Sequence, residues 1–177
     1  MSYPAKRDEV PRTVVEDAAA GNRAAFTELV AAYHHDMLRL CLVITGDHDL
    51  ANDAAQAAWH RAWRKLRQLR DPARVRSWLL TVAANEARQA FRRQGRVVAM
   101  APEAIDRPGT EVDQIGHIDL VNALRRLQPD ERRLIALRYV SGFSSVELAD
   151  AMRLTPEGVR TRLKRIVDRL RKELDNE

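Results

Sequence analysis

Apolar residues recur at helical spacing in two blocks of this 177-residue chain, and the segment between the two blocks lacks that spacing. In the first block the pattern predicts one helix or a pair of helices over 14–44, a helix over 50–69 and another over 75–93. Gly46 with its flanking aspartates, and later Gly95, mark helix ends. The composition, rich in alanine, leucine and arginine, agrees with an all-α protein.

Residues 97–118 form the segment without periodicity. They carry one basic and four acidic residues. They also contain two prolines and two glycines, namely Pro102, Pro108, Gly109 and Gly116. Such a segment reads as a linker, and its 22 residues can span about 70 Å when extended. The sequence therefore predicts two small helical domains, 13–96 and 119–177, on a flexible tether, after an N-terminal extension over 1–12 that is a candidate for disorder.

The second block contains two short amphipathic helices with a three- or four-residue joint, in the stretch SSVELADAMRLTPEGVRTRLKRI at 144–166. Two further helices are expected before it, one starting at Asp119 and one at Pro129. Ser144 with Glu147 fits a capping box, and a Thr-Pro pair opens the last helix. The spacing is that of a helix-turn-helix, although an ordinary helical hairpin with a solvated basic face has the same pattern.

The apolar stripe of the last helix decides which of its side chains stay outside. The predicted buried face consists of Val159, Leu163, Ile166, Val167, Leu170 and Leu174. The long polar side chains left outside it include Arg160, Thr161, Lys164 and Arg165. An arginine fork contacts guanine O6 and N7 together or grips a phosphate, so this face is a candidate reader of duplex DNA. Arg153 stands in the turn where glycine fits most easily, and Gly158 lies inside the helix.

Positive charge is concentrated in residues 59–96, which carry 11 basic and 2 acidic residues in a chain of net charge +5. This distribution suggests a polyanionic partner such as nucleic acid. Trp59, Trp63 and Trp78 are interleaved with the basic side chains, a combination that can stack on unpaired bases. Their helical spacing next to small residues favours anchors in the core instead. The loop at 71–76 is the better candidate for direct base contact.

No pattern in the sequence indicates catalysis. The histidines, the single cysteine Cys41 and the acidic residues do not combine at a metal-ligand spacing, and neither a phosphate-cradling glycine loop nor a nucleophile arrangement is present. We expect no enzymatic activity, no cofactor and no metal, and Cys41 is expected to be a small buried side chain. No apolar stretch suits a signal peptide or a membrane span, so a cytoplasmic location is expected.

Three stretches, in this order, resemble motifs of the extracytoplasmic-function (ECF) group of the bacterial sigma-70 family, the promoter-specificity subunits of RNA polymerase. ANDAAQAAWHRAW resembles the family's polymerase-clamp helix, and RSWLLTVAANEARQAFRRQ resembles its promoter-melting helix. LRRLQPDERRLIALRYVSGFSSVELADAMRLTPEGVRTRLKRIVDRLRKEL resembles its minus-thirty-five reader. The resemblance implies a sigma region 2 bundle at 13–96 and a sigma region 4 helix-turn-helix at 119–177.

The resemblance implies docking of the clamp helix on the coiled coil of the largest polymerase subunit. The matching positions are Asp53, Gln56, Arg61 and Trp63, whereas Ala57 stands where the family usually has glutamate. The flap region of core polymerase is a further implied contact. ECF relatives are commonly held inactive by an anti-sigma factor that covers the clamp and DNA surfaces, so such a protein is another candidate partner.

The resemblance also assigns promoter contacts. Asn85 matches an asparagine that reads the upstream edge of the minus-ten element. The loop with Asp71, Arg74, Val75 and Arg76 would capture a base flipped from the non-template strand. Relatives often carry an aromatic residue near Val75, so one of the two arginines would replace its stacking. In the last helix, the matches to minus-thirty-five contacts are Arg160, Thr161 and Arg165, with Lys164 beside them.

These features together predict an alternative sigma factor that binds core RNA polymerase and directs promoter-specific initiation, while the polymerase performs the catalysis. A free-standing helix-turn-helix regulator, which would bind operators without polymerase, is the alternative. A nucleic-acid-processing enzyme would need a cluster of acids or a metal near the basic tract, and that tract offers only Asp71 and Glu86.

Overall fold

The computed structural model describes residues 10–100, 123, 124 and 126–175. Within these ranges the chain forms helices and turns and no strand, which confirms the all-α prediction. Residues 1–9, most of the predicted linker and the predicted helix start at Asp119 lie outside the described residues. No helix within those ranges combines the length and the apolar character that a membrane span requires.

The α helices of the described part follow each other along the chain with short turns between most of them. They are α1 Arg12–Ala19, α2 Arg23–Thr45, α3 His48–Lys65, α4 Val75–Met100, α6 Pro129–Ile135, α7 Ser145–Met152 and α8 Pro156–Asp175. Two 3₁₀ turns, Leu66–Gln68 and Pro72–Arg74, connect α3 to α4. A π-helical turn, Ala136–Val140, extends α6.

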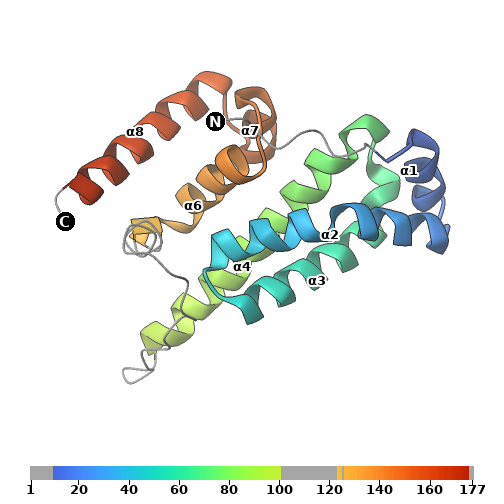
Figure 1. Ribbon diagram of the computed structural model, residues 1–177, viewed down its shortest axis with the longest axis horizontal. Coiled ribbons are helices and arrows are strands. Elements are labelled where there is room, and N and C mark those ends of the chain that lie inside the picture. Colours follow the sequence, from blue (N-terminus) through green and yellow to red (C-terminus); the bar gives the residue numbers. More distant parts are fainter. Residues whose placement is uncertain (1–9, 101–122, 125, 176–177) are drawn as a thin grey trace.

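Helices α1 to α4 form a bundle in which α2, α3 and α4 pack side by side (Figure 1). Gly21 and Gly46 both have positive φ, 97° and 69°, and separate α1 from α2 and α2 from α3. Glycine adopts this backbone conformation without a steric penalty, so it ends a helix cleanly. The Asp47 side chain then accepts a hydrogen bond from the Leu50 amide at 2.9 Å and caps α3. The predicted stop and cap around Gly46 are confirmed.

The core of this bundle combines large side chains from α2 with small ones from α3. Leu29, Met37, Leu40, Cys41 and Ile44 of α2 are completely buried. The facing positions of α3 are alanines, including Ala51, Ala55, Ala58 and Ala62, which let the helices approach closely. Each buried leucine-sized side chain stabilises the fold by about 1.5–3 kcal/mol. Cys41 is a buried core residue, as predicted, and burial raises the pKa of its thiol to about 12.

Helix α4 is longer than predicted. The sequence placed its end near Arg93, with Gly95 as the stop, but the helix continues through Gly95 to Met100. A glycine inside a helix costs only about 1 kcal/mol relative to alanine, which does not end a helix when good helix-forming residues surround it. The first four residues of the predicted linker, 97–100, therefore belong to α4.

The second block contains the predicted helix-turn-helix in α7 and α8. The Ser144 hydroxyl accepts from the Glu147 amide at 3.2 Å and the Glu147 carboxylate accepts from the Ser144 amide at 2.8 Å, which confirms the capping box. The Thr155 hydroxyl accepts from the Gly158 amide at 3.1 Å, which confirms the start of α8. Between the two helices, Arg153 has φ 55° and ψ 49°.

The two blocks pack against each other. Helix α6 and the π-helical turn after it contact α2 and α4 of the first bundle, as Figure 1 shows for α6 and α4. One cluster of buried apolar residues includes members from both blocks. The described parts of the two predicted domains thus share an interface.

The left-handed conformation of Arg153 gives a stability prediction. A side chain in this region costs about 1–2 kcal/mol, which glycine avoids, although glycine also loses more backbone entropy on folding. We expect Arg153→Gly to raise the free energy of unfolding by about 1 kcal/mol, measured by urea denaturation. Arg162→Gly, at an exposed position inside α8, is the matched control and should lower it by about 1 kcal/mol. Equal destabilisation by both changes would contradict this account of the turn.

Candidate nucleic-acid interface

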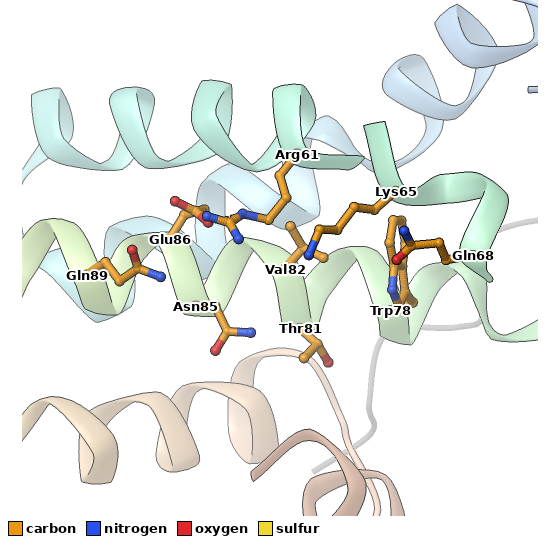
Figure 2. Close-up of a pocket in the computed structure, with 9 residues that line it drawn as sticks. All are labelled: Arg61, Lys65, Gln68, Trp78, Thr81, Val82, Asn85, Glu86 and Gln89. Carbon is orange, nitrogen blue, oxygen red and sulfur yellow. Dashed lines mark ion pairs between the residues drawn. The ribbon is translucent and has the colours of Figure 1, made fainter. Parts of the chain in front are cut away.

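A pocket of about 330 Å³ lies between α3 and α4 (Figure 2). Its lining includes Asn85 and Thr81 from α4, together with Lys65, Gln68 and Trp78. The amides and the hydroxyl can donate and accept hydrogen bonds, the indole offers an apolar face, and the ammonium group offers a positive charge. Aromatic faces, amides and cations are the groups that hold unpaired bases and their phosphates. The structure therefore places Asn85, a predicted promoter contact, in a pocket with suitable chemistry.

Arg61 lies at the edge of this pocket and faces α4. Its Nε is 2.5 Å from Oε1 of Glu86, a carboxylate that is only 5% exposed. A buried carboxylate is stable only with a charge partner or hydrogen bonds, so Arg61 has a structural role here. The predicted clamp contact by Arg61 stays a prediction. The Nε group of its guanidinium already pairs with Glu86 within the bundle.

Asp53 and Gln56 are both exposed on α3, three residues apart and therefore on one face of the helix. Ala57 is exposed next to them. Arg61 and Trp63 flank this face on its two sides, because residues eight and ten positions after Asp53 are rotated about 80° and −80° around the axis. The four predicted clamp residues thus span one broad side of α3.

The tryptophans have different environments. Trp59 is 9% exposed, and its indole N–H donates to Nδ1 of His34 at 3.1 Å, so it is the core anchor that was predicted. Trp63 is 41% exposed, and the prediction of a core anchor is wrong for it. Its ring packs edge-to-face on Phe26 with centroids 4.9 Å apart. Helical spacing identified the side of α3 correctly, but Trp63 lies at the rim of that side, where the neighbouring helix covers only part of the ring.

The loop at 71–76 is only partly available for a base. The Asp71 carboxylate accepts from the Ala73 amide at 3.1 Å and thereby caps the 3₁₀ turn. Val75 is 4% exposed, because it begins α4 and packs into the core. The prediction that Val75 contacts a flipped base is therefore wrong for this structure.

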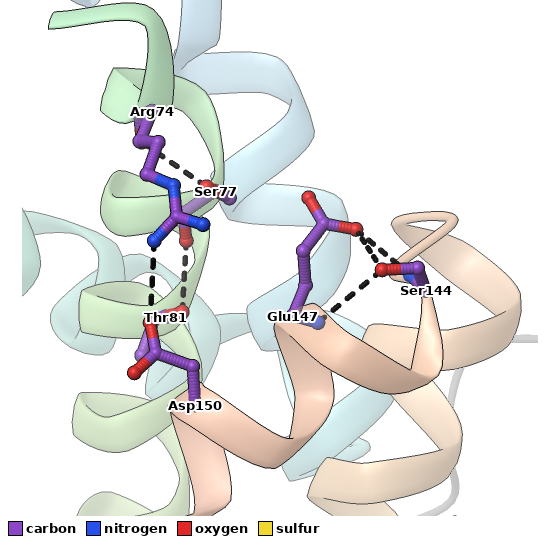
Figure 3. Close-up of polar contacts among 6 residues, drawn as sticks. All are labelled: Arg74, Ser77, Thr81, Ser144, Glu147 and Asp150. Atoms are coloured by element: carbon purple, nitrogen blue, oxygen red, sulfur yellow. Dashed lines mark hydrogen bonds and ion pairs between the residues drawn. The ribbon is translucent and has the colours of Figure 1, made fainter. Parts of the chain in front are cut away.

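Both arginines of this loop contact the second block. Arg74 Nη1 lies 3.8 Å from a carboxylate oxygen of Asp150 in α7 (Figure 3). The Arg76 guanidinium donates to the Ser141 carbonyl at 3.3 Å and lies 3.4 Å from the Asp36 carboxylate. Two of the predicted base-capture residues are thus engaged by protein groups.

The predicted reading face of α8 is exposed. Val159, Leu163, Ile166 and Leu170 are buried as predicted, although Leu174 is 37% exposed near the helix end. The side chains predicted to contact DNA are all exposed, namely Arg160, Thr161, Lys164 and Arg165. Arg160 lies 3.7 Å from Glu157, an exposed pair that contributes little to stability. The α8 face and the α3–α4 pocket are separate surfaces.

Sequence reasoning made no prediction for Arg132 and Arg133, because basic residues in a helix are usually exposed. Arg132 is 1% exposed and Arg133 is 6% exposed. Burial, followed by the nearby charge of Arg88, lowers the pKa of the Arg133 guanidinium to about 10, and its Nη2 donates to the Ala151 carbonyl at 2.7 Å.

The described residues contain no cluster of three or more potential metal ligands.

Comparison with known proteins identifies the two blocks. Residues 29–97 match Sigma-70 region 2, and residues 117–170 match Sigma-70, region 4. RNA polymerase sigma factor CarQ of Myxococcus xanthus is 30% identical over 156 residues, covering 85% of this chain and 90% of that protein. ECF RNA polymerase sigma factor SigL of Mycobacterium tuberculosis is 29% identical over 164 residues, covering 89% and 93%. The chain belongs to the ECF group of the sigma-70 family.

This ECF sigma factor also has longer relatives and a solved structural neighbour. It spans 42% of the length of the probable RNA polymerase sigma factor RfaY of Xanthomonas campestris pv. campestris, with 30% identity over 171 residues. The structure of CnrH, solved in complex with the cytosolic domain of CnrY, has a TM-score of 0.70 and 25% identity. That match covers 94% of this sigma factor and 97% of CnrH, so it includes both blocks.

The pairing of Arg61 with Glu86 gives a prediction that separates its structural role from polymerase binding. Arg61→Ala leaves the Glu86 carboxylate without its cation, and we expect a loss of about 1–3 kcal/mol in the free energy of unfolding. Adding Glu86→Gln should recover part of this loss, because a neutral amide is easier to bury. Arg64→Ala, at an exposed position of α3, should change stability by less than about 0.5 kcal/mol. Chemical denaturation measures all three, and an Arg61 variant as stable as the Arg64 control would show that the pair contributes nothing.

Proposed function

We propose that this sigma factor docks on core RNA polymerase through α3, reads an upstream promoter element with α8 and holds unpaired bases of a downstream element at the α3–α4 pocket. The observation that carries the proposal is the presence of two separate DNA-suited surfaces, the α8 face and the pocket at Asn85, on the two matched sigma regions. Each surface contacts only one of the two promoter elements, so recognition of a complete promoter needs both surfaces.

The upstream contact is made by the N-terminal half of α8. A helix-turn-helix places this half in the major groove, where long side chains reach base edges. Arg160 and Arg165 are both exposed there, whereas Leu163 is buried. The flanking Lys164 and Thr161 contact bases or phosphates.

The downstream contact is made at the pocket rather than by the whole loop at 71–76. Asn85 and Gln68 offer amides for the edge of an unpaired base, and Trp78 offers a ring on which a base stacks. Lys65 neutralises a phosphate. Arg74 reaches the same strand once its contact to the second block is released.

The polymerase contact is made by the exposed side of α3. Asp53 and Gln56 supply polar groups for the coiled coil of the clamp, and Trp63 supplies a partly exposed ring at the rim. Half-exposed tryptophans often carry a large share of the binding energy in protein interfaces. Ala57 removes one polar contact that relatives make.

The chain performs no chemical step in this proposal, since the polymerase forms the phosphodiester bonds. A factor that works on RNA polymerase acts in the cytoplasm. CnrH forms a complex with the cytosolic domain of CnrY, and an anti-sigma protein that covers α3 and the DNA surfaces is proposed as a partner of this chain as well.

In vitro transcription with purified core polymerase tests the proposal. We expect promoter-dependent initiation from templates of a genomic library only when the protein is added. Core polymerase alone is the control. A protein that never supports initiation but binds duplex DNA tightly by itself would instead be a free-standing helix-turn-helix regulator.

The α8 contact gives a second prediction. If Arg165 is bidentate to a base, Arg165→Ala should weaken discrimination between cognate and altered upstream elements by about 1–3 kcal/mol. Arg171→Ala, an exposed residue farther along α8 and about 120° around the helix from Arg165, is the control and should keep discrimination unchanged. Competition transcription between two templates measures the ratio. An equal loss on both templates would assign Arg165 to a phosphate.

A further inference from the structure

Arg61 lies on the edge of α3 that faces α4, about 80° around the helix axis from Asp53. Its side chain lines the α3–α4 pocket together with Lys65. Figure 2 shows both side chains extending from α3 toward α4, with the guanidinium of Arg61 beside Glu86. The charge of Arg61 is therefore presented at the pocket and not on the Asp53 side of the helix.

Glu86 fixes the position of this guanidinium. The Arg61 Nε lies 2.5 Å from Oε1 of Glu86, whose side chain is only 6% exposed. No other group in the described part of the chain hydrogen-bonds to this oxygen. Moving the guanidinium toward another protein would leave a buried carboxylate without its cation, which is costly. Arg61 therefore stays at the pocket, and its ligand has to come to it.

The Arg61 side chain is still 45% exposed, although its Nε is paired. Nε is the inner nitrogen of the guanidinium, so the pair with Glu86 sets the plane of the fork and leaves its outer part to a ligand. A buried ion pair stabilises a fold no better than apolar side chains of similar volume. The pair thus gives the fold little that apolar residues would not, whereas it gives the pocket an arginine of fixed orientation.

The rest of the pocket lining determines which ligand fits. A volume of about 330 Å³ is at the lower end for ligand pockets and suits a single base. Lys65 and the Trp78 indole can only donate hydrogen bonds, as can Arg61, and the one carboxylate is already paired.

The flat fork of an arginine matches a base edge that has two adjacent acceptors. Guanine has such an edge at O6 and N7. Unpaired cytosine has one at O2 and N3. Adenine and thymine carry a donor or a C–H group between their acceptors, so neither presents this edge.

We infer that Glu86 is a positioning residue that holds the Arg61 fork in the α3–α4 pocket, and that this fork makes the pocket prefer an unpaired guanine or cytosine of the promoter. The inference rests on the proposed function, because it specifies the base that the downstream pocket takes. Arg61 contacts the base, and Glu86 acts only through Arg61. The polymerase contact is then left to the remaining exposed residues of α3.

Transcription by core polymerase on templates that carry each of the four bases at each position of the downstream element tests this assignment. The wild-type chain should prefer guanine or cytosine at one position, and the preferred base shows which of the two edges is bound. Arg61→Lys keeps the charge but lacks the fork, and it should lower this preference at least about 5-fold. Glu86→Gln should lower it by a smaller factor, because the fork loses its fixed orientation.

Matched controls are Arg39→Lys and Glu28→Gln, both at exposed positions of α2, which should leave the preference unchanged. A wild-type chain that prefers adenine or thymine at every position of the element would overturn the inference. A preference that survives Arg61→Lys would overturn it as well.

A double variant separates positioning from an independent role of Glu86. If Glu86 acts only through Arg61, then Arg61→Lys combined with Glu86→Gln should lose no more preference than Arg61→Lys alone. Additive losses would overturn the positioning role. An ion pair with a purely structural role would change the free energy of unfolding and leave the base preference as it is in the wild type.

Affinity for core polymerase, measured by fluorescence anisotropy of the labelled full-length chain, separates this inference from a clamp contact. Arg61→Lys should keep the affinity, whereas Asp53→Ala should lower it. An equal loss in both variants, with the base preference kept, would place Arg61 on the clamp and overturn the inference. If the wild-type chain initiates but no variant changes the preference, the base assignment fails and the sigma function stands. If the chain never initiates, the proposed function itself fails.

Discussion

The arrangement of this sigma factor depends on one buried cation, the guanidinium of Arg132. It is 1% exposed and joins the last turn of α2, the ring of Phe91 on α4 and the backbone at Leu124. A buried charge is tolerated only when its hydrogen bonds and its electrostatic partners are in place, and removing one of them is costly. The contact between the two blocks is therefore specific, since a shifted docking position would leave this cation without its partners. The position of the helix-turn-helix relative to the first bundle follows from it.

The contact between the two blocks leaves one of the DNA-suited surfaces accessible and engages residues beside the other. The reading face of α8 is exposed, whereas the loop arginines near the α3–α4 pocket are engaged by Asp150, Asp36 and the Ser141 carbonyl. In the proposed function, Arg74 therefore has to exchange its protein partner for DNA before it contacts the promoter.

Local features of the fold were predictable from the sequence, and contacts between the blocks were not. The glycine stop at Gly46 and the capping box at Ser144 are local chemistry, as is the outward face of α8, and all are confirmed. Gly95 did not end α4, because the helical preference of its neighbours outweighs one glycine. Periodicity gives the side of a helix that is buried, but not what covers its edges, which explains the misplacement of Trp63. The assignment of Val75 to the base-capture loop came from the family resemblance, which does not show that the side chain packs into the core. Nothing in a run of two arginines in an amphipathic helix distinguishes a buried anchor from a solvated side chain.

The central claim is that this chain and core RNA polymerase together recognise two promoter elements, one with α8 and one at the α3–α4 pocket. The most direct test is in vitro transcription by core polymerase with Arg165→Ala or Asn85→Ala variants, on paired templates that differ in one promoter element at a time. The account predicts that Arg165→Ala weakens discrimination only at the upstream element and that Asn85→Ala weakens it only at the downstream element. Equal effects of both variants on both elements would contradict it.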